Sequence, residues 1–224
     1  MERRLEDRTE AGRLLADKLA AYANRSDVLV LALPRGGVPV GFEIARALNA
    51  PLDVFLVRKL GVPGQEELAM GAIARGGARL LNRDAIENLA ITEDEIRAVE
   101  AREREELERR ERAYRGGRPA PEVEGRTVIL VDDGIATGST MRVAIKALRK
   151  LRAARIVIAV AVGPLSTIEE LKREADEVVA VLTPEMLYAI SPWYEHFPQV
   201  TDLEVYDLLE MADPRRSLMI VNER

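Results

Sequence analysis

The chain has 224 residues, of which 47% are hydrophobic and 32% are charged, and its formal net charge is -5. This balance is typical of a folded globular protein, and the negative charge argues against sequence-independent nucleic-acid binding, which depends on Lys and Arg neutralising phosphates. The absence of cysteine excludes disulfides, thiolate zinc sites and cysteine nucleophiles. Because residues 1–23 lack a signal-peptide pattern and no stretch reaches ~18 apolar residues, we expect a cytoplasmic protein with neither a membrane nor a nucleic-acid partner.

Short aliphatic runs alternate with helical patterns along the chain. An amphipathic helix is predicted at residues 9–23, with Thr9 as its N-cap. Continuous apolar runs, typical of strands that are buried on both faces, occur at residues 28–33, 52–57, 127–131, 155–162 and 178–182. Further helices are predicted at residues 38–48, from about 139 to 151, and at 169–174. This alternation predicts an α/β fold with a mainly parallel, twisted sheet flanked by helices.

The middle of the chain is harder to interpret. Residues 60–77 are rich in glycine. Residues 69–74, inside this segment, and residues 78–81, directly after it, have the pattern of an antiparallel strand pair joined by a turn at 75–77. A highly charged helix is predicted at residues 92–115, with Thr92 and Glu95 forming a capping box and Gly116 following its end. We interpret it as a solvated helix, and a contact between two copies of the chain is the alternative.

Residues 128–140 (VILVDDGIATGST) carry the clearest chemistry. An apolar strand is followed by Asp132 and Asp133, by a loop rich in Gly, Ser and Thr, and by the start of a helix. Helix N-termini bind phosphate through free backbone N–H groups, and Gly138 allows an anion to approach closely. Two carboxylates would repel a lone phosphate, but they accept hydrogen bonds from sugar hydroxyls. A ribose phosphate therefore fits both ends of the segment.

This segment resembles, at all of its positions, the signature with which type I phosphoribosyltransferases bind 5-phosphoribosyl-1-pyrophosphate (PRPP). By that resemblance Asp132 and Asp133 hold the ribose 2- and 3-hydroxyls, and residues 136–140 cradle the 5-phosphate. The PRPP-binding residues are then Asp132, Asp133, Gly134, Ile135, Ala136, Thr137, Gly138, Ser139 and Thr140. The segments LPRGGVPV, VRKLG and VDDGIATG are also similar to those of bacterial and archaeal predicted phosphoribosyltransferases whose acceptor is not known.

The family has a second anion site, for pyrophosphate, after its first core strand. Here the turn Pro34-Arg35-Gly36-Gly37 follows the run at 28–33, and it offers free N–H groups and a bidentate phosphate donor. Arg58 and Lys59 follow the second run and resemble the family's basic residues that meet pyrophosphate. We expect catalytic, leaving-group-stabilising roles for Arg35, Arg58 and Lys59, and pyrophosphate binding by Arg35, Gly36, Gly37, Arg58 and Lys59. A plain strand-to-helix turn and surface charge are the alternatives.

The resemblance also implies a layout for the whole chain. Residues 60–77 correspond in position to the mobile loop that covers the site in this family, and its closure would exclude water from a cationic sugar intermediate. We expect one domain over residues 1–224, with a core at about 26–165 and a loop and helical elaboration at about 60–122. A small C-terminal hood is expected at about 166–224. Family members often dimerise, so a homodimer is compatible with the resemblance.

The implied reaction is displacement of pyrophosphate from C1 of PRPP by a nitrogen of a nucleobase or related acceptor. Mg²⁺ is the expected cofactor, held mainly through PRPP near Asp132 and Asp133 rather than by a protein metal site. Where 6-oxopurine enzymes carry an Asp before the Thr-Gly of the loop, this chain has Ala136. This difference argues against a hypoxanthine or guanine enzyme that uses that general base.

The acceptor is expected under the hood, where the tail holds much of the aromatic content. Tyr188, Trp193 and Tyr194 are candidates for stacking on a base, and His196, the only histidine, is a candidate for acting on it. Tail packing is the competing interpretation of these aromatic residues.

Two other classes of function compete with a transferase. A PRPP-binding regulatory module without turnover would use the same fold, and it would be distinguished by PRPP-dependent binding of nucleic acid. A phosphatase is suggested by acids that follow a strand, but haloacid-type phosphatases need an Asp-x-Asp arrangement. Asp132 and Asp133 are adjacent, so in an extended strand their side chains point to opposite faces. We therefore expect a phosphoribosyltransferase whose acceptor the sequence does not name.

Overall fold

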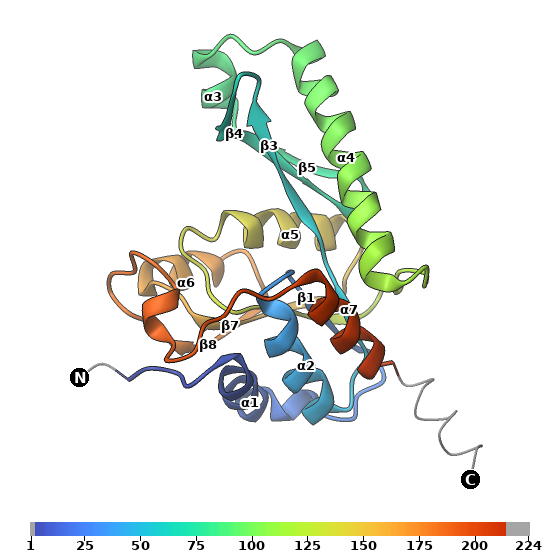
Figure 1. Ribbon diagram of the computed structural model, residues 1–224, viewed down its shortest axis with the longest axis vertical. Helices are drawn as coiled ribbons and strands as arrows, with labels where there is room; N and C mark the ends of the chain where they lie inside the picture. The colour runs from blue at the N-terminus through green and yellow to red at the C-terminus, as the bar shows by residue number, and fades with distance from the viewer. Residues whose placement is uncertain (1–2, 214–224) are drawn as a thin grey trace.

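Five parallel strands form the centre of the protein, which a computed structural model describes for residues 3–213 (Figure 1). Their order is β2-β1-β6-β7-β8, and every neighbouring pair is parallel. The strands are β1 (Val28–Ala32), β2 (Leu52–Val54), β6 (Thr127–Asp132), β7 (Arg155–Val162) and β8 (Glu177–Leu182). Because β1, β6 and β7 are buried along nearly their whole length, they are continuous apolar runs in the sequence. The predicted parallel α/β fold is confirmed.

Helices cover both faces of this sheet (Figure 1). They are α1 (Arg8–Lys18) and α2 (Gly37–Leu48) on one face, and α5 (Ser139–Lys150) and α6 (Leu165–Leu171) on the other. Alternate strand residues divide between two cores, as the two-residue period of a strand requires. Val30 and Ile129 pack with α1 and α2, whereas Leu31 and Leu130 pack with α5 and α6. The core therefore has three layers.

The first helix begins earlier than predicted. Asp7 is its N-cap, because the carboxylate accepts a hydrogen bond from the N–H of Glu10 at 2.8 Å. Thr9 lies inside the helix, so the prediction that it caps the helix is wrong. The α-helix ends at Lys18, and a 3₁₀ turn, η1 (Ala20–Tyr22), completes the predicted segment. The cap brings Arg8 into the first turn of α1, which matters for the site.

A second, antiparallel sheet extends away from the core and, with two helices, forms an arm that we define as residues 57–115 (Figure 1). Its elements are β3 (Val57–Val62), β4 (Gln65–Ala74), β5 (Ala78–Leu81), α3 (Arg83–Asn88) and α4 (Glu93–Arg115). The predicted pairing of β4 with β5 is confirmed, and a 3₁₀ turn, η2 (Arg75–Gly77), joins them. The run at 52–57 is not one strand, since β2 ends at Val54 and Val57 begins β3 in the other sheet.

Most of residues 60–77, expected as a loop, is therefore β-structure. The physical reason is that both faces of the arm's sheet find apolar partners. Ala74 and Leu80 pack on one side with α5, and Leu60 and Met70 pack on the other with α4. Such packing on two sides was not visible in a glycine-rich segment whose period is irregular.

Helix α4 starts and stops where the sequence predicts. Thr92 and Glu95 form a capping box, and Gly116 ends the helix in the left-handed region with a φ of 56°. It is not solvated all round, because one side of the helix packs against β3, β4 and α7. The buried apolar and aromatic residues of that side are Ile96, Val99, Leu107 and Tyr114.

An N-terminal segment and a C-terminal segment of the described chain pair beside the site. A short 3₁₀ turn, η3 (Ser191–Trp193), is followed by a segment that we call the strap, residues 194–198, and then by α7 (Asp202–Met211). The N–H of Leu5 donates to the carbonyl of Trp193 at 2.9 Å, and the N–H of Glu195 donates to the carbonyl of Leu5 at 2.8 Å. Helix α7 packs against both α2 and α4, so the C-terminal part contacts the core and the arm.

Within residues 3–213, no helix combines the length and the apolar surface that crossing a membrane requires.

Candidate active site

Two loops predicted from separate motifs touch at the carboxyl edge of the parallel sheet. The turn after β1 precedes α2 and the loop after β6 precedes α5, and parallel strands end at the same edge. A Cβ added to Gly36 would lie 2.0 Å from Asp133 Oδ2, and one added to Gly37 would lie 2.7 Å from the carbonyl oxygen of Val131. Neither glycine has a positive φ. These two positions therefore need glycine because the loops approach so closely.

The two acids at the end of β6 have different surroundings. Asp133 is buried, and its Oδ2 accepts a hydrogen bond from Arg8 Nε at 2.8 Å. The hydroxyl of Tyr194 donates to the carbonyl oxygen of Asp133 at 2.6 Å. Asp132 is half-buried, and its Oδ1 accepts the N–H of Asp133 at 2.9 Å. Burial, and then the charge of Asp133, raise the pKa of the Asp132 carboxyl well above its ordinary value. Asp133 thus has a countercharge built into the fold, whereas a cation or hydrogen-bond donors would favour the charged form of Asp132.

The loop that follows has the features of a phosphate site. Gly138 adopts a φ of 71° and caps α5, whose first-turn N–H groups have no partner within the helix. Thr137 and Ser139 are exposed, and their hydroxyl oxygens lie 2.9 Å apart. The hydroxyl of Thr167 on α6 donates to the carbonyl of Ala136 at 2.9 Å and holds the loop in place. The arrangement can bind an anion through backbone N–H groups and hydroxyls.

Arg35 lies where the turn after β1 approaches α4 and α7. The Pro34–Arg35 peptide bond is cis. The Arg35 guanidinium is partly exposed, and its Nη1 lies 3.8 Å from Asp202 Oδ1. The hydroxyl of Tyr114 donates to the same carboxylate at 2.7 Å. Burial, together with that hydrogen bond, raises the pKa of Tyr114 to about 12. The contact of Arg35 with Asp202 is long and exposed, so an arriving anion can compete for the arginine.

Arg58 and Lys59 belong to β3, not to the end of a parallel strand. Arg58 Nε donates to Glu103 Oε2 of α4 at 2.9 Å. The side chain lines a cavity of about 70 Å³ whose walls include Pro34 and Thr140, so Arg58 lies beside both predicted loops. Lys59 is exposed and, with Arg102 and Glu103 of α4, belongs to the lining of an adjoining cavity of about 420 Å³. The structure therefore brings Arg58 to the two loops and places Lys59 further out along the arm.

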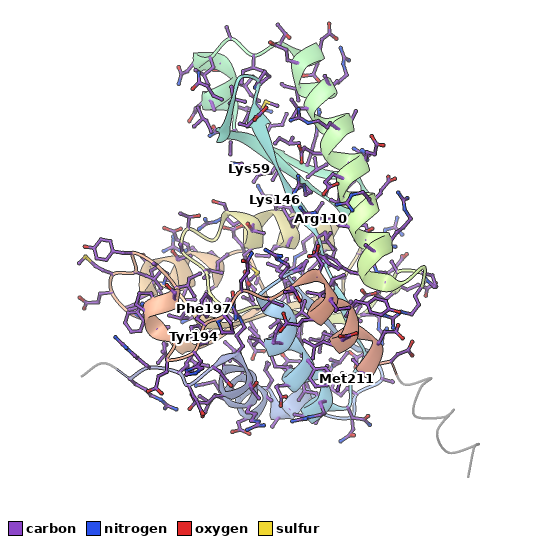
Figure 2. All side chains as sticks on the ribbon, viewed as in Figure 1. Lys59, Arg110, Lys146, Tyr194, Phe197 and Met211 are labelled. Atoms are coloured by element: carbon purple, nitrogen blue, oxygen red, sulfur yellow. The ribbon has the colours of Figure 1, made fainter. Side chains whose placement is uncertain are left out.

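Two arginines of this region were not predicted from the sequence. Arg110 of α4, which Figure 2 labels, lines the same cavity as Arg58, and its Nε lies 2.8 Å from Glu106 Oε1. Arg8 of α1 forms the buried ion pair with Asp133. Arg110 is one charge among many in residues 92–115, and Arg8 precedes Asp133 by 125 positions. No spacing or motif distinguishes either residue.

The aromatic residues of the tail divide into buried and exposed members. Tyr194 is only 3% exposed, and its ring stacks on Phe197 with centroids 4.7 Å apart (Figure 2). This burial leaves Tyr194 no exposed face for a base and corrects its expected role as a stacking residue. Tyr188 is 89% exposed and, with Trp193, lines an open cavity of about 970 Å³. The side chain of His196 is exposed at the surface of the strap.

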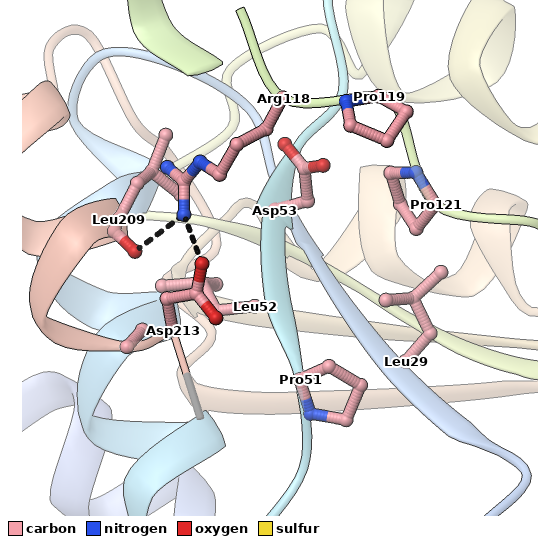
Figure 3. A pocket seen from close by; sticks show the side chains of 10 residues that line it. Leu29, Pro51, Leu52, Asp53, Arg118, Pro119, Pro121, Leu209 and Asp213 are labelled. Atoms are coloured by element: carbon pink, nitrogen blue, oxygen red, sulfur yellow. Dashed lines mark hydrogen bonds and ion pairs between the residues drawn. The ribbon is translucent and has the colours of Figure 1, made fainter. Parts of the chain in front are cut away.

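Another cavity, of about 150 Å³, lies near the starts of β1 and β2 (Figure 3). Arg118 closes one side by donating to the carbonyl of Leu209 at 3.4 Å and to Asp213 Oδ2 at 3.1 Å. Beside it, Arg115 Nε donates to the half-buried carboxylate of Asp53 at 3.0 Å, and partial burial raises the pKa of that carboxyl. None of the predicted site residues lines this cavity.

Among residues 3–213, no three acidic or histidine side chains converge as they would around a metal ion bound by the protein alone.

Comparisons with known proteins agree with this geometry. The family model described as phosphoribosyl transferase domain matches residues 4–189. A Mycobacterium tuberculosis (strain H37Rv) protein with the provisional name phosphoribosyl transferase Rv0571c is 45% identical over 207 residues, which cover 92% of this chain and 46% of that protein. The chain thus spans about half the length of the curated relatives it matches.

A solved structure is also similar over most of its length. The crystal structure of TT1426 from Thermus thermophilus has 41% sequence identity and a TM-score of 0.78, and the match covers 92% of this chain and 97% of that one. Since the family match includes both loops at the sheet edge and the arm, this chain belongs to the phosphoribosyl transferase domain family, as its resemblance to type I phosphoribosyltransferases predicts.

Proposed function

We propose that this protein transfers the 5-phosphoribosyl group of PRPP to a nitrogen of a nucleobase or related acceptor and releases pyrophosphate, in a reaction that needs Mg²⁺. The observation that carries the proposal is the direct contact between the turn at 34–37 and the acid-bearing loop at 132–140. One site thereby offers the start of α5 for one anionic end of a ligand and the Arg35-bearing turn for the other, with carboxyl groups between them for a sugar.

Each part of PRPP has a matching part of this site. The 5-phosphate is cradled by the start of α5, and the ribose hydroxyls face the acid pair. Pyrophosphate lies against the turn after β1 and the basic side chains of the arm. The residues concerned are Asp132, Asp133 and residues 134–140 for the ribose phosphate, and Arg35, Gly36, Gly37, Arg58 and Lys59 for pyrophosphate.

Positioning and electrostatics supply the catalysis. As the bond from C1 to pyrophosphate breaks, negative charge grows on the leaving group and positive charge grows on the ribose ring. Arg35 belongs to the turn and Arg58 lies beside it, so both can stabilise the leaving group, and Arg110 shares a cavity with Arg58. The arm is thus part of the site, which supports treating residues 1–224 as one functional domain. We expect it to act in the cytoplasm.

The acidic residues of the site fit Mg²⁺ that arrives with the substrate. Mg²⁺ usually binds one or two carboxylates together with substrate phosphates and several waters. Asp132 is half-buried and has a raised pKa, so a cation would stabilise its charged form. When bound, Mg²⁺ would neutralise charge on pyrophosphate and polarise the leaving oxygen.

The acceptor is expected over the loop after β6. The side chain of Ile190 packs so closely on Gly134 that a Cβ there would lie 2.6 Å from it, so the segment that carries Tyr188 and Trp193 lies against the loop. The two aromatic side chains are therefore candidates for stacking on a flat base. Ala136 provides no general base at its position, which favours acceptors other than hypoxanthine and guanine.

Calorimetric titration of Mg·PRPP into the full-length protein tests the proposal. We expect saturable binding by the wild type, loss of binding in Asp132→Asn, and release of pyrophosphate when a panel of nucleobases is added. A folded wild-type protein that does not bind PRPP would contradict the proposal. Binding without pyrophosphate release with any base would instead favour a PRPP-binding module without turnover.

A further inference from the structure

A buried ion pair joins the first helix to the acid pair of the proposed site. Arg8 Nε lies 2.8 Å from Asp133 Oδ2, and the two side chains are 10% and 11% exposed. Building on the proposed function and narrowing the part that it gives to the acid pair, we propose that Arg8 is a positioning residue for PRPP. Arg8 fixes and neutralises Asp133, and Asp132 is the member of the pair that contacts the ribose hydroxyls.

Arg8 is held by the strap as well as by Asp133. Its Nη1 donates to the carbonyl of Pro198 at 2.7 Å, and its guanidinium carbon lies 3.9 Å from the centroid of the Phe197 ring. These contacts use the planar fork and the flat face of the guanidinium, neither of which lysine has. The side chain is therefore fixed in one position, and it fixes the carboxylate it meets.

Asp133 is fixed from three directions. Arg8 holds its carboxylate, the hydroxyl of Tyr194 holds its carbonyl oxygen, and Gly36 lies directly against the carboxylate. Turning Asp133 toward a ligand would leave a buried arginine without its partner, which is strongly unfavourable. Among the described residues Asp132 has no arginine partner: its Oδ1 accepts the N–H of Asp133, and its carboxyl interacts with that of Asp133. The two adjacent acids therefore have separate tasks.

The charge of Arg8 also makes the site compatible with an anionic substrate. Two adjacent carboxylates repel each other and would repel the phosphates of PRPP. Arg8 cancels one of the two negative charges and opposes the rise in the pKa of Asp132. Without Arg8, binding of PRPP would have to overcome an additional buried negative charge.

The test compares Mg·PRPP affinity and thermal unfolding in the full chain. We expect Arg8→Met to weaken PRPP binding by about 10-fold to 100-fold, the typical effect of losing a hydrogen bond to a charged group. Arg8→Lys, which keeps the charge but not the strap contacts, should lie between Arg8→Met and the wild type. Arg13→Met is the matched control, because Arg13 lies on the same helix, is 66% exposed and pairs only loosely with Glu43 at 3.5 Å. Wild-type affinity in a folded Arg8→Met protein would overturn the proposal.

A charge-removal series keeps the test decisive if Arg8→Met does not fold. The double variant Arg8→Met/Asp133→Asn removes both charges of the pair, so it should fold and still bind PRPP. Asp132→Asn should lose PRPP binding without losing stability. Equal loss of PRPP binding in Asp132→Asn and in the double variant would overturn the proposal, because it would show that Asp133 itself contacts the ribose.

Failure of the proposed function gives a different result. If the wild type binds no PRPP, the proposed function fails. The melting temperatures of the single and double variants then still test the pair, because additive changes would exclude the coupling.

Discussion

Replacing Gly36 with alanine tests the close contact on which the site depends. The new Cβ would lie 2.0 Å from Asp133 Oδ2, 2.5 Å from its Cγ and 2.9 Å from its Oδ1. The carboxylate cannot swing away freely, because Arg8 Nε holds it at 2.8 Å. The backbone of Gly36 has a φ of -63° and a ψ of -30°, which alanine adopts without strain. The cost therefore comes from the contact alone.

Added atoms in a closely packed region typically cost about 1–3 kcal/mol, and the smaller unfolded-state entropy of alanine offsets about 0.4–1 kcal/mol of this. We expect a net loss of about 1–2 kcal/mol, which lowers the melting temperature of a chain of this size by about 2–8 °C. PRPP affinity should fall as well, because both loops must shift.

Thermal unfolding followed by circular dichroism measures the effect. Gly41→Ala is a suitable control: it lies on the same helix, and its Cβ would meet side-chain carbons of Ala32 and Leu52 at 3.1 and 3.2 Å, so a smaller loss is expected. Adding Gly36→Ala to Asp133→Ala should cost much less than adding it to the wild type. A wild-type melting temperature in Gly36→Ala, or an equal loss in the Asp133→Ala background, would refute the explanation.

Three further predictions concern other parts of the molecule. Arg58→Ala and Arg110→Ala should each weaken binding of pyrophosphate about 10-fold, since each removes one charged donor, and isothermal titration with pyrophosphate would measure this. Arg115→Met should lower the free energy of unfolding in urea by about 3–5 kcal/mol, because it leaves the half-buried Asp53 carboxylate without its arginine. Tyr114 has a folded-state pKa of about 12 against an ordinary value of 10.0, so its contribution to stability is complete below pH 10 and is lost as the pH rises toward 12. Tyr114→Phe should therefore show a flatter loss of stability across that interval, and an unchanged slope would contradict the role of this hydroxyl.

Much of the candidate site could be predicted because its parts are local. Residues 128–140 form one strand–loop–helix unit, so the acids, the glycine and the hydroxyls occur together in the sequence, and the turn at 34–37 is a second such unit. Parallel strands end at the same edge, which is enough to expect the two units side by side. Arg8 and Arg110 could not be predicted in this way. Their roles come from helices distant in the sequence, and a single arginine in a charged helix has no distinguishing pattern.

The sequence by itself determined the strands of the parallel sheet, the ends of the charged helix and the two candidate anion-binding loops, because apolar periodicity, caps and glycine-rich turns are properties of neighbouring residues. Only the tertiary structure decided that residues 57–62 join the predicted antiparallel pair in a sheet between α4 and α5, that Tyr194 is buried, and that Asp133 is paired with Arg8. These outcomes depend on which surfaces exclude water from one another and on which charges meet in the interior. Both the packed surfaces and the paired charges come from segments that are far apart in the chain, so short-range sequence patterns cannot reveal these outcomes.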